Sequence, residues 1–350
     1  MVTSEQVARL AGVSRATVSR VLNGSSHVSD ETKKRIYSAI ATLGYGSNVF
    51  TRVVPQDRSH MIALALFGSE DGLNFSQLTR TQCYFYLELL RFIERAVAEQ
   101  GYDLFLPSHP YDTFDAGGDP AMNYVLALQA KRIEGVITLA LRVDDPRIQG
   151  LCRSSIPAVF IDSFFQGEHA TYVKTDYTNG AAQATEHLLQ LGHKRIAFFT
   201  GDLFSATGTE RFLGHQQAMA RAGLTIDPRL VCQTSWEEQD AYQTAMTLLS
   251  ERRDFTGIVA SSDMLAFGVL RALRKHNIRV PEEVSVIGFD DIDRSQHADP
   301  PLTTIRQDKQ AISEGAVAGL FRLIRGEEVP PPLTVPTSLV VRASTGPAPV

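Results

Sequence analysis

Apolar residues recur at helical spacing in three short stretches within the first 44 residues of the chain. Thr3 can cap the first helix, with Gln6 reaching back in a capping box, and Gly12 ends it. The apolar positions of this helix are Val7, Ala8, Leu10 and Ala11. The pattern predicts a short amphipathic helix that buries these side chains.

The next two stretches begin at Ser14 and Ser29, and serine is a favoured N-cap residue. Asp30 and Glu31 in the first turn of the third helix favour its dipole, and Gly44 ends it. The inward positions are Val18, Val21 and Leu22 in the second helix and Ile36, Ile40 and Leu43 in the third. Three short helices are therefore expected to close a small core of their own.

The outward face of the second helix has the residue types that read DNA. A recognition helix in the major groove needs free side chains near its N-terminus, and Arg15 and Arg20 can each fork onto guanine O6 and N7. Ala16 suits a thymine methyl group, and the hydroxyls of Ser14 and Thr17 suit phosphate. The predicted DNA contacts of this head are Ser14, Arg15, Ala16, Thr17, Arg20 and Asn23. The alternative is a plain αα-hairpin with two solvated arginines.

From residue 61 onward, short apolar runs alternate with helical stretches. One series is MIALALF, GVITLA and IPAVFID, and a second is KRIAFFTG, TGIVASS and VSVIGFDD. Buried parallel strands read as unbroken apolar runs, and the helices between them cover both faces of the sheet. The rhythm predicts an α/β body of two doubly wound lobes behind the all-α helix-turn-helix head.

The charge of the chain is unevenly divided. The chain has 350 residues, of which 43% are apolar and 21% are charged. This length is more than one compact domain normally needs. The formal net charge is −5, but residues 1–58 hold eight Lys and Arg against four Asp and Glu, so the remainder carries −9. Contacts with DNA phosphates are therefore expected from the head, while the acidic body discourages nonspecific wrapping.

Three cysteines, Cys83, Cys152 and Cys232, are widely separated and lack CxxC spacing, so we expect neither a disulfide framework nor a zinc site. The N-terminus has no basic and apolar leader, and no apolar run approaches the roughly 20 residues of a membrane helix. We expect a soluble cytoplasmic protein with no metal or cofactor.

The stretch VARLAGVSRATVSRVLNG, followed by HVSDETKKRIYSAIATLGY, resembles the N-terminal domain of the LacI/GalR family of transcription regulators. Further matches follow at IPAVFID, LLQLGHKRIAFFTG, ERFLGH, SSDMLAFGVLRAL, VPEEVSVIGFDD and PPLTTIRQD, so the resemblance covers most of the chain. It implies a body like that of periplasmic binding proteins, with three chain crossings between the lobes and a small-molecule effector in the cleft. It also implies a repressor that binds double-stranded operator DNA as a homodimer.

The resemblance divides the chain into a helix-turn-helix domain at 1–46, a hinge or linker at 47–60, an effector-binding and dimerisation domain at 61–342 and a tail at 343–350. Lobe one is expected at about 61–162 plus 292–324, and lobe two at about 163–291 plus 325–342. The end of the chain has no leucine heptads of the kind that join some relatives into tetramers. A dimer is therefore expected, with two heads for two half-sites.

The linker departs from the family. Relatives usually carry a proline, an asparagine, an Ala-Arg pair and a leucine here, and fold into a hinge helix on DNA whose leucine opens the minor groove. This chain keeps Asn48 and Arg52 but has Ser47, Thr51 and Val54 at the other positions. Asn48, Arg52 and Val54 are predicted to contact DNA. Because valine is shorter than leucine and β-branched residues disfavour helix, the alternatives are a smaller kink or a tether without fixed structure.

Polar residues follow several predicted strands of the body. Asp162 ends IPAVFID, Ser262 and Asp263 follow the strand in TGIVASS, and Asp290 ends VSVIGFD. In open α/β sheets, ligands bind beyond the carboxyl ends of the strands, which makes these residues candidate effector contacts. By resemblance, Arg211 in ERFLGH matches the arginine with which the family contacts its effector.

A sugar pocket needs charged groups for the hydroxyls and an aromatic face for the C–H side of the ring. Trp236 lies where relatives place a stacking aromatic, and Tyr86, or Phe85 beside it, can cover the opposite side from lobe one. Two of these residues have a structural role as the alternative to effector contact. Asp263 is equally suited to cap the next helix, and Trp236 is suited to fill the core. Ser262 stands where some sugar-binding relatives have asparagine. A sugar is the leading effector, with a nucleobase or another metabolite as the alternative.

An enzyme fits the sequence poorly. There is no GxSxG, Walker A or HExxH motif and no GxGxxG after a strand, and the nine histidines form no ligand pattern. His193, at a helix-to-strand turn, is expected to be structural. A sugar-binding receptor whose head no longer binds DNA has support only from the altered linker. The sequence therefore predicts a transcription regulator that is not an enzyme.

Overall fold

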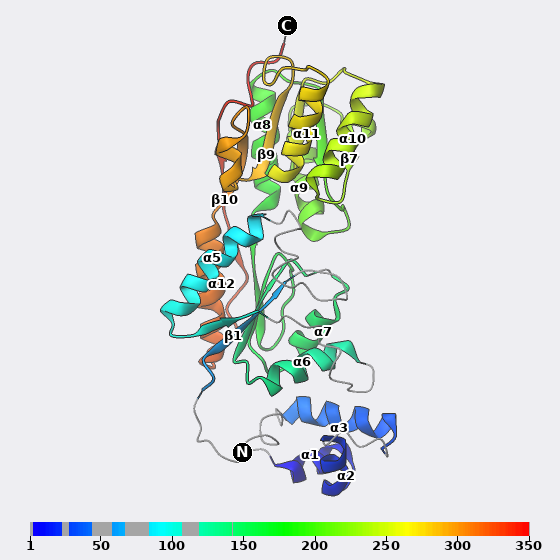
Figure 1. The fold of residues 1–350 in the computed structure, drawn as a ribbon, viewed down its shortest axis with the longest axis vertical. Coiled ribbons are helices and arrows are strands. Elements are labelled where there is room, and N and C mark those ends of the chain that lie inside the picture. The colour runs from blue at the N-terminus through cyan, green and yellow to red at the C-terminus, as the bar shows by residue number, and fades with distance from the viewer. Residues whose placement is uncertain are drawn as a thin grey trace. The chain divides into compact units, whose positions relative to one another are not determined.

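The computed structural model describes residues 3–22, 28–43, 58–66, 84–106, 119–141 and 143–349 of the chain (Figure 1). Eight positions that the sequence analysis named lie outside these residues: Asn23, Gly44, Ser47, Asn48, Thr51, Arg52, Val54 and Cys83. The described chain comprises the N-terminal helices and the two lobes of the body, and each is treated below by itself.

The three predicted helices of the head are present as α1 (Ser4–Ala11), α2 (Arg15–Leu22) and α3 (Asp30–Leu43). Thr3 caps α1 in a capping box with Gln6, and Gly12 ends the helix in the left-handed conformation at φ +66°. Ser14 and Ser29 each accept a hydrogen bond from the backbone N–H three residues further on. The capping residues read from the sequence therefore set the starts of all three helices.

One cluster of small and β-branched side chains forms the core of the head: Val7, Ala8, Ala11, Val18, Val21, Ile36, Ala39 and Ile40. The prediction that Leu10 belongs to this core is wrong, because its side chain is 54% exposed. A two-turn helix presents only a narrow stripe to its neighbours, and position 10 lies beside the stripe that 7, 8 and 11 form.

The sheet of the first lobe has the strand order β11-β5-β4-β3-β1-β2. The strands are β1 (Met61–Leu66), β2 (Asp103–Phe105), β3 (Gly135–Leu139), β4 (Ala158–Ile161), β5 (Ala170–Thr175) and β11 (Leu333–Val335). The pairs β1–β2, β1–β3, β3–β4 and β4–β5 are parallel. Every residue of β3 and β4 is buried, which explains why these strands read as unbroken apolar runs.

Helices cover both faces of this sheet (Figure 1). On one face, α6 (Pro120–Ala130) and α7 (Pro146–Arg153) bury Tyr124 and Leu151 against Phe160 of β4. On the other face lie α5 (Tyr84–Glu99) and α12 (Lys309–Ile324). A Cβ at Gly135 would come within 3.0 Å of the Leu320 side chain, so α12 packs closely on β3 at this glycine and a larger residue would have to displace Leu320.

The sheet of the second lobe repeats this layout in the order β12-β10-β9-β8-β6-β7. The strands are β6 (Ile196–Thr200), β7 (Val231–Gln233), β8 (Gly257–Ala260), β9 (Ser285–Asp290), β10 (Thr303–Gln307) and β12 (Thr337–Val340). β12 is antiparallel to β10, and the other pairs are parallel. Helices α8 (Tyr177–Gln190) and α9 (Ala206–Arg221) pack together, as do α10 (Glu238–Glu251) and α11 (Asp263–Lys275).

The structure corrects the predicted lobe boundaries, since the chain passes between the lobes later than expected. Besides the chain up to β1, the first unit holds Phe92–Val173 and Ser313–Leu333. The second holds Lys174–Ile312, the chain from Thr334 and the start of α5 up to Arg91. β5 was missed because its residues, ATYVKT, alternate between buried and half-buried. The segment from 292 to 307 was assigned to the wrong lobe, because β10 pairs with β9.

The predicted tail at 343–350 is part of the second lobe as far as Ala348. His193 Nε2 lies 3.0 Å from the carbonyl oxygen of Gly346, and the N–H of Ala348 donates to the carbonyl of Leu191 at 2.8 Å. The other ring nitrogen of His193 lies 2.9 Å from the hydroxyl of Thr256. His193 therefore joins the tail to the core of the lobe, which is the structural role expected for it.

Candidate functional site

The predicted recognition face of α2 is exposed, as the sequence analysis expected. Val18 and Val21 are buried in the core of the head, whereas Arg15, Ala16 and Arg20 are exposed. Because the two inward valines fix the rotation of this short helix, both guanidinium groups are presented to a partner outside the head. This arrangement suits fork-like hydrogen bonding to guanine edges in a major groove.

Ser14 and Thr17 lie together at the N-terminus of α2. Their hydroxyl oxygens are 2.9 Å apart, and the N–H of Thr17 donates to Ser14 Oγ at 3.2 Å. The first N–H groups of a helix and its dipole favour an anion at this end, so the pair suits contact with a DNA phosphate.

In the second lobe, Arg211 is the charged residue around which the candidate effector site is built. It lies in the second turn of α9, whose N-cap is Ser205, and only 6% of its surface is exposed. One terminal nitrogen donates to the carbonyl of Ser261, at the end of β8, and another lies 3.7 Å from Asp290 Oδ1. A buried guanidinium needs such acceptors, because its desolvation is otherwise costly.

Aromatic rings enclose the same guanidinium. Its central carbon lies 4.3 Å from the ring centroid of Phe289, 4.7 Å from that of Tyr177 and 5.4 Å from that of Trp236. Cation–π attraction holds the plane of Arg211 in place without using its N–H groups. Phe289 and Tyr177 were not predicted as site residues, although Phe289 directly precedes the predicted Asp290.

Asp290 is held at the carboxyl end of β9 by a chain of hydrogen bonds. Gln307 Nε2 donates to Asp290 Oδ1 at 2.7 Å, and the hydroxyl of Thr175 donates to Gln307 Oε1 at 2.6 Å. Burial raises the pKa of Asp290 above its usual range, and Arg211 and Gln307 act in the opposite direction. Arg211 therefore favours the ionised form of a carboxylate that burial alone would neutralise.

Trp236 is half-buried and lies over Gly201. A Cβ on Gly201 would come within 2.0 Å of the indole ring, so only glycine permits this contact.

Three of the predicted effector residues have a positive φ, namely Trp236 at +70°, Asp162 at +63° and Asp290 at +123°. Non-glycine residues adopt this backbone rarely, and such strain gathers at ligand sites.

Ser262 and Asp263 have structural roles. Ser262 caps α11 by accepting a hydrogen bond from the N–H of Leu265 at 3.2 Å. The carboxylate of Asp263 is fully buried, and burial followed by the charge of Asp290 raises its pKa. It accepts hydrogen bonds at 3.0, 2.6 and 2.5 Å from the N–H of Ile292 and the hydroxyls of Ser295 and Thr304. Since both oxygens of Asp263 are engaged within the lobe, its contact with an effector loses support.

The remaining predicted effector contacts are divided between the lobes. Phe85 is buried, Tyr86 is half-buried, and their rings lie 5.2 Å apart at the start of α5. This part of α5 belongs to the second unit, which corrects the assignment of both residues to lobe one. Asp162 follows β4 in the first lobe and is 8% exposed.

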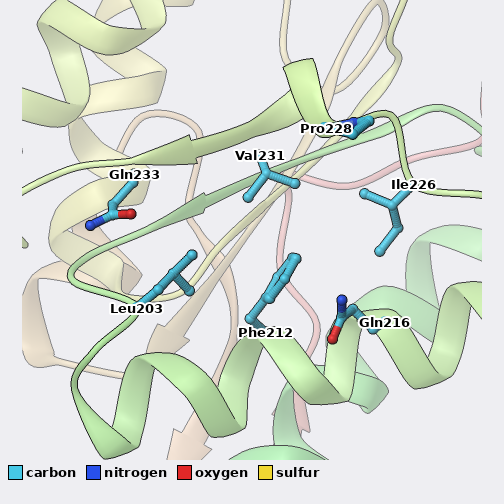
Figure 2. Close-up of a pocket in the computed structure, with 7 residues that line it drawn as sticks. All are labelled: Leu203, Phe212, Gln216, Ile226, Pro228, Val231 and Gln233. Atoms are coloured by element: carbon cyan, nitrogen blue, oxygen red, sulfur yellow. The ribbon is translucent and has the colours of Figure 1, made fainter.

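An open pocket of about 420 Å³ lies elsewhere on the second lobe (Figure 2). It is lined by Leu203, Phe212, Gln216, Ile226, Pro228, Val231 and Gln233. Phe212 and Gln216 project from α9 into this pocket, whereas Arg211 is held by Ser261 and Asp290. None of the predicted effector residues lines it, so we do not assign the effector to this pocket.

Comparison with known proteins relates both parts of the chain to one family. Residues 4–48 match the family described as bacterial regulatory proteins, lacI family, and residues 185–345 match a periplasmic binding protein-like domain. The repressor PurR of Haemophilus influenzae is 32% identical over 93% of this chain and 91% of its own length. This chain belongs to the LacI family.

Solved structures of LacI-family members have the same fold as this regulator. A CelR–cellobiose complex is 32% identical with a TM-score of 0.72, covering 98% of this chain and 100% of that one. A lac repressor dimer bound to operator and the anti-inducer ONPF is 27% identical with a TM-score of 0.70, covering 99% of each chain. The regulator CelR of Thermobifida fusca is also 32% identical by sequence, over 98% of both chains.

These findings confirm the predicted helix-turn-helix head, the periplasmic-binding-protein-like body and the family. This LacI-family chain is a DNA-binding transcription regulator, and the relatives named above are regulators rather than enzymes. In the part of the chain that the structure describes, no helix is long and apolar enough to cross a bilayer.

Proposed function

We propose that this LacI-family regulator is a cytoplasmic repressor that binds a two-fold-symmetric operator as a homodimer and responds to a sugar. Each subunit would contribute one α2 to one half-site, with Arg15, Ala16 and Arg20 at the base edges. Asn48, Arg52 and Val54 of the linker are proposed as further DNA contacts. That the lac repressor is similar to this chain, and was solved as a dimer on operator DNA, supports this part of the proposal.

The observation that carries the effector proposal is the buried pair of Arg211 and Asp290 with Trp236 beside it. A guanidinium and a carboxylate can together donate to and accept from vicinal hydroxyls, and an indole face covers the C–H side of a pyranose. Asp162, Phe85 and Tyr86 are proposed as additional contacts. A relative at 32% identity was solved with cellobiose, which supports a carbohydrate.

A nucleobase is the second candidate effector. Arg211 and Asp290 also suit the edge of a planar heterocycle, and Trp236 suits its face. Ser262 keeps this alternative open, because its hydroxyl caps α11 at a position where some sugar-binding relatives have an asparagine.

The testing experiment selects bound duplexes from a random DNA library with the full-length protein at moderate salt. A two-fold-symmetric site would support the dimeric repressor, and the selected duplex would then serve to screen mono- and disaccharides, including cellobiose, against purine and pyrimidine bases. Release of DNA by a sugar alone supports the proposal, and release by a base alone replaces the sugar. Absence of any enriched site, with or without these compounds, contradicts the proposed operator binding.

A further inference from the structure

The junction between the linker and the first lobe is fixed by side chains that the effector site does not use. Residues 58–60 directly precede β1. They lie against Tyr102, which directly precedes β2, and Glu134, which directly precedes β3. The carbonyl of His60 accepts a hydrogen bond from the N–H of Asp103 at 2.7 Å. Three segments that are distant in sequence therefore meet where the body continues toward the DNA-binding head.

Glu134 is the acceptor at the centre of this junction. Its Oε1 accepts from the N–H of His60 at 2.9 Å and from the hydroxyl of Ser59 at 3.3 Å, and its Oε2 accepts from the hydroxyl of Tyr102 at 2.9 Å. The hydroxyl of Ser59 also donates to the carbonyl of Arg132. Hydrogen bonds to a charged acceptor are stronger than neutral ones, so one half-buried carboxylate holds both residues that precede β1.

The backbone at His60 needs such a restraint. Its φ is +55°, a left-handed conformation that costs free energy for any residue with a Cβ. The imidazole lies 4.8 Å from the ring of Tyr102, and Tyr102 in turn packs edge-on against Phe321 of α12 at 4.8 Å. The turn at His60 is thus held against the folded core of the lobe through Tyr102, a residue that is 7% exposed.

We propose that Glu134 is a positioning residue for operator binding, which fixes the point and direction from which the linker leaves the first lobe. The proposal rests on the dimeric operator binding proposed above. If the junction opens, residues 58–60 join the linker, and three extended residues add about 10 Å of reach in each subunit. That length is about three base pairs of helix axis, so a dimer with open junctions would tolerate altered half-site spacing.

The test compares operator duplexes with the selected spacing and with one or two base pairs inserted at the centre. Glu134→Ala is expected to weaken binding to the selected spacing by about tenfold and to lose most of the preference over the lengthened duplexes, because it removes three hydrogen bonds at once. Tyr102→Phe, which removes one donor, should lie between Glu134→Ala and the wild type.

Glu134→Gln is the conservative variant, since its carboxamide oxygen can still accept from His60 while the hydroxyl of Tyr102 turns to accept from its NH2 group. It is expected to keep the spacing preference. Glu99→Ala removes a matched glutamate of the same lobe, whose side chain is 61% exposed and paired with Arg95, and should bind as the wild type does.

Retention of both affinity and spacing preference by Glu134→Ala would overturn the proposal. So would a lower midpoint of thermal unfolding with the preference intact, because Glu134 would then act on stability alone. These results differ from a failure of the proposed function, in which the wild-type protein itself selects no symmetric site.

Discussion

The head and the second lobe use arginine in opposite ways. Arg15 and Arg20 are exposed on a helix whose rotation is fixed by two buried valines, so the protein orients these guanidinium groups and leaves them accessible to the proposed DNA partner. Arg211 is 6% exposed, and the rings and acceptors around it belong to its own lobe. The proposed DNA contact would be completed only by DNA, whereas the surroundings of Arg211, at the proposed effector site, are already formed by the protein itself. Substitution of Arg15 or Arg20 should therefore change binding without changing stability, whereas substitution of Arg211 should change both.

The largest effect is expected for Arg211→Ala. Removing the buried guanidinium leaves Asp290 without its cation, and the effector should bind about 3 kcal/mol more weakly, enough to abolish release of DNA at the wild-type inducing concentration. Operator affinity without effector should stay the same. Titrating the effector identified by the screen against a labelled duplex measures both quantities.

Arg221→Ala is the matched control, because Arg221 lies on the same helix but is 56% exposed and paired with Glu186 at 2.6 Å. Arg211→Lys keeps the charge but not the planar fork and should respond only at higher effector concentration. An unchanged response of Arg211→Ala would show that the effector binds elsewhere.

Arg15→Ala is expected to cost about 1–3 kcal/mol of discrimination at one base position in each half-site. Because the side chain is exposed, the free energy of unfolding should not change. Repeating the duplex selection with the variant shows which position loses its preference. Lys34 is an exposed cation on α3, and Lys34→Ala should weaken binding to all sequences equally or not at all. A loss of base preference in the Lys34 variant would show that α3, and not α2, reads the bases.

A smaller effect concerns the pH dependence of the second lobe. Burial raises the pKa values of both Asp263 and Asp290, so the folded lobe holds more protons than the unfolded chain above about pH 4. The contribution of this pair to stability is therefore full below that pH and is lost as the pH rises through the folded-state pKa values. Asp290→Asn removes one titrating group and one like charge, so this loss should be smaller in the variant.

Urea unfolding followed by circular dichroism between about pH 5 and pH 8 checks this sign. His215 contributes in the opposite sense, because burial lowers its pKa to about 4 and stability from this group rises with pH up to about 6.5. The comparison of Asp290→Asn with the wild type cancels that contribution. A steeper loss of stability in the variant would contradict the assignment.

The smallest effect is expected for Leu10→Gln, within about 0.5 kcal/mol of the wild-type stability, because Leu10 lies outside the core of the head. Val18→Ala on the neighbouring helix should cost about 1–3 kcal/mol, since its side chain is fully buried. Thermal unfolding of both variants distinguishes the two positions. If the Leu10 variant were as unstable as the Val18 variant, Leu10 would belong to the core of the head, as the sequence predicted.

The sequence predicted those features that depend on neighbouring residues. The capping box of Thr3 and Gln6, the inward face of α2 and the buried strands all follow from local spacing. Arg211 and Trp236 came from resemblance to a family and Asp290 from its place at the end of a predicted strand, and the structure brings these three together. The linker contacts and Asn23 lie outside the described residues and stay predictions.

Features set by long-range contacts were missed. Tyr177 and Phe289 enclose Arg211 only because α8 and β9 meet, and no local pattern signals that meeting. Asp263 follows a strand, as a ligand contact would, yet its partners Ser295 and Thr304 come from a later segment of the chain. The lobe boundaries failed for the same reason, because pairing between strands decides to which sheet β5 and β10 belong.

The position of Trp236 has a practical consequence for spectroscopy. It is the only tryptophan among 350 residues, it is half-buried, and its ring lies over Gly201 and 5.4 Å from the guanidinium of Arg211. Indole emission of the unlabelled protein therefore originates at one place, beside the proposed effector contacts. A ligand that excludes water from this ring should shift the emission to shorter wavelength, so occupancy is readable in the absence of DNA and of any dye.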